Sequence, residues 1–410
     1  RRLINSLADE DPAVYAAFLA DRRQAEGESH VVRNSGRYPL CGRGDINTYA
    51  IFAETNRLIV GSRGRVGCIV PSGIATDDTT KNFFRDLVER GDLVSLYDFE
   101  NRKKMFPAVA HQQKFCLLTL SGPDHDPGAD AEYAFFLQSV EDLRDPDRRF
   151  TLTTADLALL NPNTRTCPVF RTRRDAEITK AIYRRVPILV KDGRHEENPW
   201  GFSFKQGLFN MTSDSHLFRT REQLEGAGWR LEGNVFVRGS DRYLPLYEAK
   251  MIHQFDHRWT LYDGTEARAV TTLEKKDPRF VVLPRYWVPD RITESRIPGN
   301  WEQAWPPGWR DITNSTNERT VIAAAIPKAG VGHTMPLLFS PHDWFALACL
   351  QANLSCFVFD YVARQKVGGT HLTYGFLKQL PTLTPESVSG DAPWQPERLD
   401  HWISQRVLEL

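Results

Sequence analysis

The first half of the sequence predicts an α/β fold, namely half of a doubly wound sheet that is parallel with one antiparallel edge strand. The apolar run VGCIV at 66–70 is typical of a strand that helices cover on both faces. A helical pattern links it to a second strand, LVSLYDFE at 93–100, and strand, crossover helix, strand is the unit of such folds. The strand KFCLLTL at 114–120 follows a link too short for a crossover helix, so we expect it to run antiparallel.

Composition limits the partners and the kinds of site. The 410 residues carry 52 Lys or Arg and 52 Asp or Glu, so a nucleic-acid partner would have to be held by a local basic patch. The six scattered cysteines contain no CxxC pair, which predicts reduced thiols of a cytoplasmic protein and no metal site. Gln351, Asn353 and Asp360 interrupt the most apolar segment, FALACLQANLSCFVFDYV, so we expect a core helix and no membrane span.

Residues 1–44 combine a helical pattern with the polar run GESHVVRNSGRYPLCGRG, which we interpret as a surface excursion of the first domain. The helix after this run is expected to begin at Asp45 or Asn47, because either side chain can cap its first turn. Gly61 or Gly64 is expected to end that helix. One face of the helix is apolar and is therefore predicted to be buried.

The crossover helix between the first two strands is expected to begin at Asp77 or Asp78 and to end at Gly91. Its apolar residues Phe83 and Phe84 are predicted to face the sheet.

The composition of the chain changes near Asn161, where we expect a domain boundary. Residues 45–160 are predicted to form the sheet domain. Residues 161–384 contain short helical and strand-like pieces with many Trp, Gly and Arg residues, which indicates a mixed α+β domain. Residues 385–410 indicate a polar linker and a final amphipathic helix.

One long helix is predicted in the second domain. Ser340 can cap its start, and Asp343 favours the first turn. Apolar residues then follow at helical spacing through Phe357 up to the pair Gly368-Gly369.

Several segments, taken in order, resemble one known family. GDINTYAIFAE, RGRVGCIVPSGI, and MFPAV followed by QKFCLLTL resemble the later motifs of amino-methylating DNA methyltransferases whose target-recognition region follows the catalytic domain. YLPLYEAKMIHQFDHRW and ANLSCFVFDYVARQKVGGTHLTYGFLKQLP resemble recognition segments of members that fuse methylation to cleavage, the type IIG-like restriction-modification enzymes. The resemblance touches most of the chain. It implies the carboxyl-terminal half of a Rossmann-like methyltransferase domain, followed by a mixed α+β target-recognition domain.

The resemblance implies methylation of adenine at N6 in double-stranded DNA, with S-adenosylmethionine as the methyl donor. The base must leave the duplex because its amino group is paired inside the stack, and an aromatic side chain then stacks on it. Phe106-Pro107 matches the aromatic-proline pair that supplies one stacking face in the family, and the plain alternative is a core phenylalanine. Pro71 and Ser72 end a parallel strand, where doubly wound sheets bind ligands, so they are either pocket residues or strand terminators.

Two family motifs are not found in this sequence: an aromatic-x-Gly-x-Gly loop that cradles the methyl donor, and an Asn-Pro-Pro-aromatic motif that binds the target amine. The tripeptides NPN at 161–163 and NPW at 198–200 depart from the second motif, so neither is assigned a catalytic role. We therefore predict no catalytic residue within this chain. Because the chain also begins without methionine inside a helical pattern, it is expected to be an inactive part of a longer enzyme. Its missing amino-terminal part would bind most of the S-adenosylmethionine.

DNA recognition needs basic and amide side chains that meet phosphates and base edges. Two clusters of such side chains lie in the family-like segments of the second domain, and a solvated charged face is the alternative for each. The predicted DNA-binding residues are Lys250, His253, Gln254, His257, Arg258, Arg364, Lys366 and His371. Asp256 is expected to orient Arg258 and not to bind a metal ion.

The preferred hypothesis is therefore part of a site-specific DNA adenine-N6 methyltransferase of a restriction-modification or phage-defence type. Its predicted partner is double-stranded DNA, and the resemblance leaves room for other restriction or defence subunits. The alternative is a non-enzymatic DNA-recognition subunit that keeps a degenerate methyltransferase half-domain. A small-molecule methyltransferase is a weaker third hypothesis, because it would not need so large a recognition region.

Overall fold

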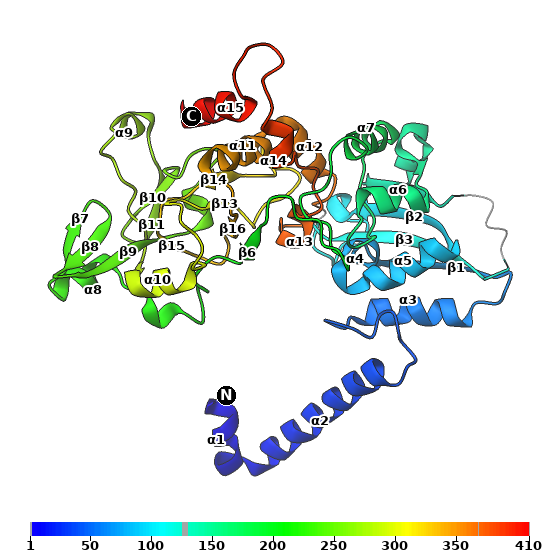
Figure 1. Ribbon diagram of the computed structural model, residues 1–410. Coiled ribbons are helices and arrows are strands. Elements are labelled where there is room, and N and C mark those ends of the chain that lie inside the picture. Colours follow the sequence, from blue (N-terminus) through cyan, green and yellow to red (C-terminus); the bar gives the residue numbers. More distant parts are fainter. Residues whose placement is uncertain (1, 125–129, 368, 410) are drawn as a thin grey trace. The chain divides into compact units, whose positions relative to one another are not determined.

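The computed structural model describes residues 2–124, 130–367 and 369–409, and the chain divides into two compact units, residues 1–180 and 181–410 (Figure 1). Each unit contains both helices and strands. The division follows Lys180, later than the boundary expected near Asn161. Residues between these two points contact the first unit: the backbone N–H of Cys167 donates to the carbonyl of Ala75 at 2.8 Å. The Lys180 ammonium also lies 3.5 Å from the carboxylate of Asp156.

Three helices precede the first strand: α1 (Arg2–Glu10), α2 (Pro12–Asn34) and α3 (Thr48–Ile59). The Asp11 side chain caps α2 by accepting a hydrogen bond from the N–H of Val14 at 3.1 Å. The helix includes the first part of the polar run that was expected to be an excursion. All 23 residues of α2 are described and none is buried, so a helix occupies this surface position. Asn47 caps α3 as expected, whereas the helix ends at Ile59, before either predicted glycine.

The sheet of the first unit has the strand order β1-β3-β2-β4-β5. The strands are β1 (Arg65–Pro71), β2 (Leu93–Glu100), β3 (Lys114–Ser121), β4 (Glu132–Leu137) and β5 (Phe150–Thr151). β3 is antiparallel to both β1 and β2, so these two run in one direction, and β4 is parallel to β2. The predicted antiparallel strand is confirmed, but its predicted place at the edge is wrong. The crossover from β1 to β2 leaves space for one strand between them. β3, which follows β2 after a short loop, occupies that space.

Among the described residues the edge strands are instead β1, which pairs with β3 only, and β5, which runs antiparallel to β4. The apolar run predicted that the side chains of β1 are buried on both faces of the sheet. They are not. Val70 is buried, but the side chain of Ile69 is 56% exposed. An edge position with incomplete helix cover explains the difference.

The crossover from β1 to β2 consists of α4 (Gly73–Thr76), a 3-10 turn (Asp78–Thr80) and α5 (Lys81–Arg90). Thr80 is the N-cap of α5 in place of the predicted aspartates, because the chain first makes the 3-10 turn that follows Asp77. Gly91 ends α5 with a φ of +75°, a left-handed conformation that glycine adopts without steric cost. Phe83 and Phe84 are buried as predicted. Figure 1 shows α5 and α6 (Thr154–Leu160) on opposite sides of the sheet.

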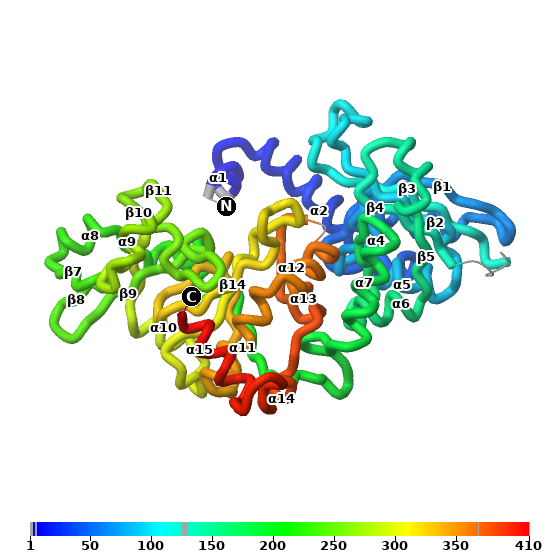
Figure 2. Tube along the Cα trace, turned by 90° about the horizontal axis from the view of Figure 1, so that it is seen from above, coloured from blue at the N-terminus to red at the C-terminus, as the bar shows by residue number. Residues whose placement is uncertain are grey.

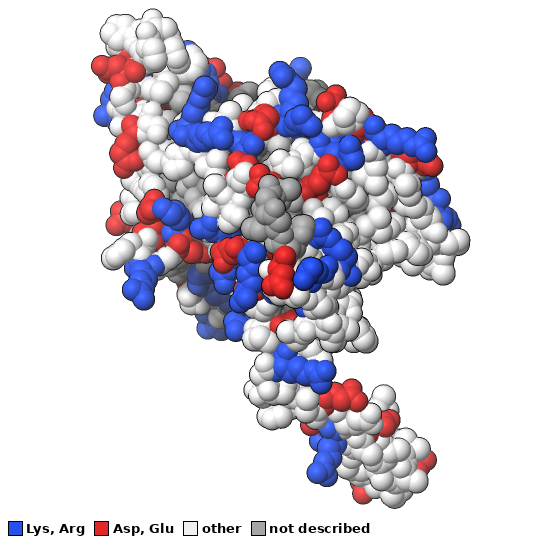
Figure 3. Space-filling view, turned by 90° about the vertical axis from the view of Figure 1, so that its right-hand side faces the viewer, with Lys and Arg blue, Asp and Glu red and all other residues white. Residues whose placement is uncertain are grey.

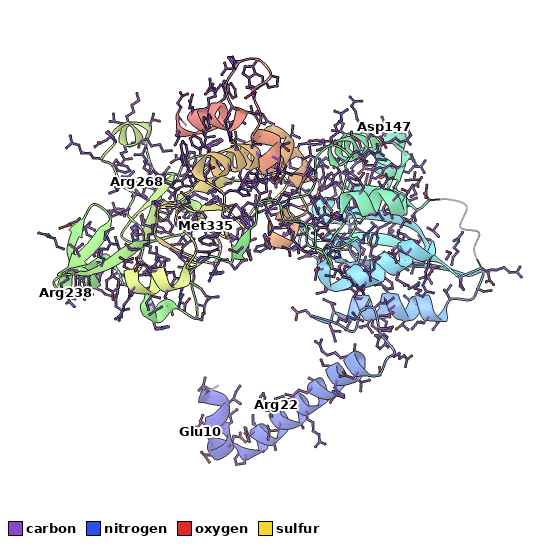
Figure 4. All side chains as sticks on the ribbon, viewed as in Figure 1. Glu10, Arg22, Asp147, Arg238, Arg268 and Met335 are labelled. Carbon is purple, nitrogen blue, oxygen red and sulfur yellow. The ribbon has the colours of Figure 1, made fainter. Side chains whose placement is uncertain are left out.

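The second unit is a mixed α+β structure, as predicted, with two four-stranded paths and a separate hairpin among the described residues. One path is β12-β9-β8-β7 with β15 paired to β9, the other is β14-β13-β16-β6, and the hairpin is β10-β11. Met335 is fully buried within this unit, whereas Arg238 and Arg268 lie at its periphery (Figure 4).

The strands of this unit are β6 (Ser203–Lys205), β7 (Arg230–Glu232), β8 (Val235–Arg238), β9 (Asp241–Tyr247), β10 (Thr260–Asp263), β11 (Glu266–Ala269), β12 (Trp287–Pro289), β13 (Pro307–Trp309), β14 (Ala323–Ala325), β15 (Gly330–Val331) and β16 (Leu337–Phe339). After α7 (Arg173–Tyr183), its α-helices are α8 (Arg221–Gly226), α9 (Thr272–Lys276), α10 (Asp290–Arg296), α11 (Trp344–Ser355), α12 (Phe357–Arg364), α13 (Tyr374–Leu377), α14 (Pro385–Val388) and α15 (Leu399–Glu409). The final helix, α15, agrees with the prediction and packs against α11 (Figure 2).

The predicted long helix is two helices, α11 and α12, which meet at Cys356 with a bend of 53°. Asp343 is the N-cap of α11 and accepts a hydrogen bond from the N–H of Ala346 at 2.9 Å, so Ser340 is not the cap. Because of the bend, the side chain of Phe357 is 83% exposed and does not continue the buried face. α12 ends at Arg364, and the predicted end at Gly368 lies outside the described residues.

No single helix among the described residues is long and apolar enough to cross a membrane. α11 and α12 reach the necessary length and composition only as a bent pair.

Candidate functional site

The carboxyl ends of the parallel strands β1, β2 and β4 lie at one edge of the first sheet, and the predicted pocket residues gather there. Pro71, the last residue of β1, pairs in register with Phe115 at the start of β3. The ring of Phe106, in the loop between β2 and β3, meets the ring of Phe115 edge to face, with centroids 4.9 Å apart. Phe106 remains 39% exposed and the neighbouring Pro107 is exposed. Phe115 thus connects Pro71 and Phe106, which were predicted as pocket residues from separate segments of the sequence.

Asn101 holds the loop that carries Phe106. Its side chain is fully buried, and its Nδ2 donates to the carbonyls of Phe106 and Val109, each at 2.9 Å. Its Oδ1 accepts the N–H of Phe106 at 3.0 Å, and its own N–H donates to the carbonyl of Gln113 at 3.1 Å. Sequence reasoning missed this residue. The available signal was an asparagine directly after a strand, because such side chains bond to nearby backbone in turns.

Ser72 and Asp98 connect the end of β1 to β2. The Ser72 hydroxyl donates to Oδ1 of Asp98, and Oδ2 accepts the N–H of Phe136 at 3.2 Å. Asp98 is 2% exposed, and this burial raises the pKa of its carboxyl although both hydrogen bonds and Lys114 favour the charged form. The contact gives Ser72 a structural role, while its contact with a substrate stays a prediction.

Phe136 bulges out of β4 next to Asp98. Its φ of +57° lies in the left-handed region, which an aromatic residue rarely adopts, and the register of β2 against β4 shifts beside it. The Lys114 ammonium lies 4.3 Å and the Arg171 guanidinium carbon 4.2 Å from the centre of its ring. Strained residues of this kind cluster at functional sites. Here the bulge gathers two cations at the carboxyl edge of the sheet.

Glu100, the last residue of β2, moderates this positive charge. One carboxylate oxygen lies 2.9 Å from Nε of Arg102, and the other lies 3.9 Å from Nζ of Lys114. The edge therefore combines a partly exposed aromatic ring with several basic side chains and two carboxyl groups, those of Asp98 and Glu100. An aromatic face beside Lys and Arg is the combination that binds unpaired bases and their phosphates.

In the second unit, Lys250 and His253 lie beside aromatic rings. Lys250 is exposed, and its ammonium lies 4.7 Å from the centre of the Tyr262 ring. The His253 ring packs on Trp259 with centroids 4.2 Å apart. Burial and the Arg310 guanidinium lower the pKa of His253, so the neutral imidazole is favoured. His253 is thus more suited to hydrogen bonding or stacking than to pairing with phosphate.

Gln254 and His257 are tied to the interior of the second unit. Nε2 of Gln254 donates to the carbonyls of Val321 at 3.3 Å and Ser355 at 3.4 Å. Burial lowers the pKa of His257, which again favours the neutral ring.

The guanidinium of Arg258 donates hydrogen bonds to two backbone carbonyls in and after α9, those of Lys275 at 3.2 Å and Phe280 at 3.4 Å. Asp256 accepts the backbone N–H of Arg258 at 2.7 Å and binds the Lys275 ammonium at 2.6 Å. Asp256 therefore orients the Arg258 backbone, not its guanidinium. Within the described residues, no group of three or more His, Cys, Asp or Glu side chains could hold a metal ion.

The second predicted cluster does not form one surface. Arg364 binds Asp360 at 2.9 Å and donates to the carbonyls of Ser315 and Glu318. Lys366 is only 6% exposed, and its ammonium lies 4.8 Å from the centre of the Tyr183 ring. The expected surface position of Lys366 is therefore wrong, and its burial lowers its pKa.

His371 is the exposed member of this cluster. Its side chain is 54% exposed, and its Nδ1 lies 3.1 Å from a carboxylate oxygen of Asp311. On the face drawn in Figure 3, basic and acidic side chains are interspersed.

No family model matches the sequence, and no curated protein matches it. Among solved structures, a chain similar to this one is the type IIG restriction endonuclease BpuSI, with 12% identity, 95% of this chain and 47% of that chain covered, and a TM-score of 0.31. The Type IIL restriction-modification enzyme MmeI, solved in complex with DNA, has 9% identity, 88% and 42% coverage, and a TM-score of 0.39. DrdV, also solved with DNA, has 10% identity, 88% and 39% coverage, and a TM-score of 0.37. The chain spans less than half the length of each, and TM-scores this low do not establish a common fold.

Proposed function

We propose that the chain is the carboxyl-terminal part of a site-specific DNA adenine-N6 methyltransferase of a restriction-modification or phage-defence type. The observation that supports this most is the setting of Phe106-Pro107. The pair lies in the loop between β2 and β3, where an antiparallel strand enters the sheet between two strands of the opposite direction. The family that the sequence resembles has its aromatic-proline pair at the corresponding turn, leading into the sixth and seventh strands.

In this proposal Phe106 stacks on an adenine that has left the duplex. The exposed part of its ring is available to a base. The ring also packs edge to face on Phe115, which stacks in turn on the buried Phe99 with centroids 5.5 Å apart. Asn101 fixes the loop backbone on both sides of Phe106. A ring held this way loses little freedom when a base binds, which strengthens binding.

The described residues do not fit S-adenosylmethionine by themselves, because the chain has no glycine loop that could cradle it. No methyl-transfer step is therefore assigned to this chain. We propose that residues outside it hold the methyl donor and the target amine. The edge strand β1 supports a further partner on this side of the sheet, because a strand that pairs on one side only among the described residues and has an exposed Ile69 is normally covered.

We propose that the second unit recognises DNA, with Lys250 and His371 as the first candidates for contact, because both side chains are exposed. Three further candidates are partly accessible, but each already has a partner within the protein. His253 packs on Trp259, Arg258 donates to the Lys275 carbonyl, and Arg364 binds Asp360. Lys366 could reach a phosphate only after rearrangement of the fold around it.

Mapping of N6-methyladenine tests the proposal. The intact protein would be produced in a host whose DNA lacks this modification, and the genome would be sequenced by a method that detects it. We expect methylated adenines at one short recurring sequence. Unmethylated DNA together with sequence-specific DNA binding by the soluble protein would contradict the methyltransferase and favour the non-enzymatic recognition subunit. The missing catalytic motif keeps that alternative open.

A further inference from the structure

The backbone around His371 is fixed to a neighbouring segment of the second unit. Ile312 and His371 form an antiparallel bridge, and the N–H of Leu372 donates to the carbonyl of Asp311 at 2.7 Å. The indole Nε1 of the fully buried Trp309 also donates, to the carbonyl of Leu372 at 2.8 Å. These bonds come from residues far away in the sequence, and they hold His371 in one place.

Asp311 fixes the imidazole ring of His371 as well. Asp311 is 7% exposed, and its Oδ2 lies 3.1 Å from Nδ1 of His371. Its other carboxylate oxygen, Oδ1, has no hydrogen-bond partner among the described residues. A carboxylate only accepts hydrogen bonds, and a buried one needs a donor, so the neutral ring keeps its proton on Nδ1. The carboxylate thus sets both the direction of the ring and its tautomer.

Nε2 of His371 is left for a partner outside the chain. The side chain is 54% exposed, and no described residue makes a hydrogen bond to Nε2. Gly369, Thr370 and Thr373 beside it are exposed too. Because the proton of the neutral ring lies on Nδ1, Nε2 is a hydrogen-bond acceptor. An exposed acceptor on a fixed ring loses little freedom when it binds, which favours a specific contact.

We propose that His371 recognises one base of the DNA by accepting a hydrogen bond at Nε2 from an exocyclic amine in the major groove. The N6 amine of adenine and the N4 amine of cytosine are the donors that bases present there. Phosphate oxygens only accept hydrogen bonds, so they do not match a neutral Nε2. Asp311 is the positioning residue, because it acts through the ring of His371. The inference rests on the proposed recognition of DNA by the second unit.

Selection from a pool of duplexes with a randomised centre supplies the DNA for the test. The 410-residue chain is used at about pH 8.5, because alkaline solution favours neutral histidine. We expect the natural chain to enrich one consensus. His371→Ala should lose a preference of about tenfold for adenine or cytosine at one position, the effect of one net hydrogen bond, and keep the other preferences. His195→Ala replaces another exposed histidine of the second unit and should enrich the natural consensus.

Removal of the amine from the enriched duplex tests the contact itself. Purine replaces adenine, or 2-pyrimidinone replaces cytosine, and each lacks only the exocyclic amine. The change should weaken binding by the natural chain about tenfold and binding by His371→Ala very little, since the variant has no partner for the amine. Asp311→Ala should lose the same single preference. Because His371 is exposed, His371→Ala keeps the test valid if Asp311→Ala does not fold.

An unchanged consensus in His371→Ala would overturn the inference, and so would equal losses in both proteins when the amine is removed. A reduced slope of log affinity against log salt in His371→Ala would also overturn it, because that result indicates a charged ring on a phosphate. An unaltered preference in folded Asp311→Ala would remove the positioning role. If the natural chain enriches no consensus, the proposed DNA recognition by the second unit fails together with this inference.

Discussion

Asn101 makes three side-chain hydrogen bonds to the Phe106 loop from a position without solvent exposure. Replacement by Ala would leave two carbonyls and one N–H of the loop without these partners. We expect Asn101→Ala to lower the free energy of unfolding by about 2–3 kcal/mol. Urea denaturation of the purified chain measures this, with the exposed Lys103→Ala as a control that should change little. Equal stability of the two variants would show that the loop does not depend on Asn101.

Asp98 makes the folding stability of the first unit depend on pH. Because burial raises the folded-state pKa of its carboxyl above the ordinary 3.8, the folded protein holds this proton more tightly than the unfolded chain. The resulting stability is fully present below 3.8 and is lost as the pH rises through the folded-state pKa. Asn at this position can still accept the Phe136 N–H but does not titrate.

We therefore expect natural protein to lose melting temperature relative to Asp98→Asn as the pH rises from about 4 to about 7. Thermal denaturation of both proteins across this range measures the difference between their melting temperatures. A difference that stays constant with pH would mean that Asp98 titrates normally in the folded state.

Lys250 tests DNA contact by the second unit, because its ammonium is exposed. If it meets a phosphate, Lys250→Ala should weaken binding to all duplex sequences and reduce the slope of log affinity against log salt by about 0.9. Fluorescence anisotropy with labelled duplexes at several salt concentrations measures the slope. Lys328→Ala is the matched control, since Lys328 binds Glu294 at 2.8 Å. An unaltered slope in Lys250→Ala would rule out the contact.

Single residues could be predicted where their role is local. Asn47 was one of the two predicted caps of α3 and Gly91 was the predicted end of α5, because each residue acts within its own turn. Lys366 was placed on the surface and is buried, since the aromatic ring beside it belongs to Tyr183, far away in the sequence. Asn101 was missed because its three bonds depend on how the following loop closes.

At the level of elements, the bend between α11 and α12 shows how tertiary contacts override a continuous helical pattern. Oδ1 of the buried Asp360 on α12 accepts the backbone N–H groups of Thr320 and Val321 at 2.7 and 2.8 Å. These bonds fix α12 against a segment outside the helix, so the chain breaks at Cys356. No helical spacing rule contains that information.

Phe357→Gln tests the bend. The ring is 83% exposed and the Arg319 guanidinium carbon lies 4.9 Å from its centre, so we expect the free energy of unfolding to change by at most about 1 kcal/mol. Phe359→Ala, two residues later and 1% exposed, should cost about 3–5 kcal/mol. Chemical denaturation of both variants measures these values. A loss in Phe357→Gln as large as that in Phe359→Ala would indicate one straight helix with Phe357 in the core.

Strand direction was more predictable than strand order. The short link between β2 and β3 required an antiparallel turn, and the structure has one. The insertion of β3 between β1 and β2 is a pairing between distant segments, which local pattern does not specify. The same limit explains why β1 was expected to be covered on both faces although Ile69 is exposed.

For the whole molecule, the sequence predicted an α/β region followed by a mixed α+β region but could not place the residues that join them. Residues near Cys167 belong with the first unit through a backbone bond to Ala75, which no change in composition reveals. The resemblance supplied the functional hypothesis. The geometry adds that Phe106 is partly exposed at the carboxyl edge of the first sheet, on a loop that Asn101 holds in place.

Adenine-dependent DNA binding by Phe106→Ala in the intact protein tests the central claim most directly. The quantity is the difference in affinity between a duplex with the target adenine and the same duplex with an abasic site there. We predict that Phe106→Ala reduces this difference by about 1–3 kcal/mol, while Phe106→Tyr and the loop control Val109→Ala retain it. An unchanged difference in Phe106→Ala would contradict the account and leave Phe106 as a packing residue.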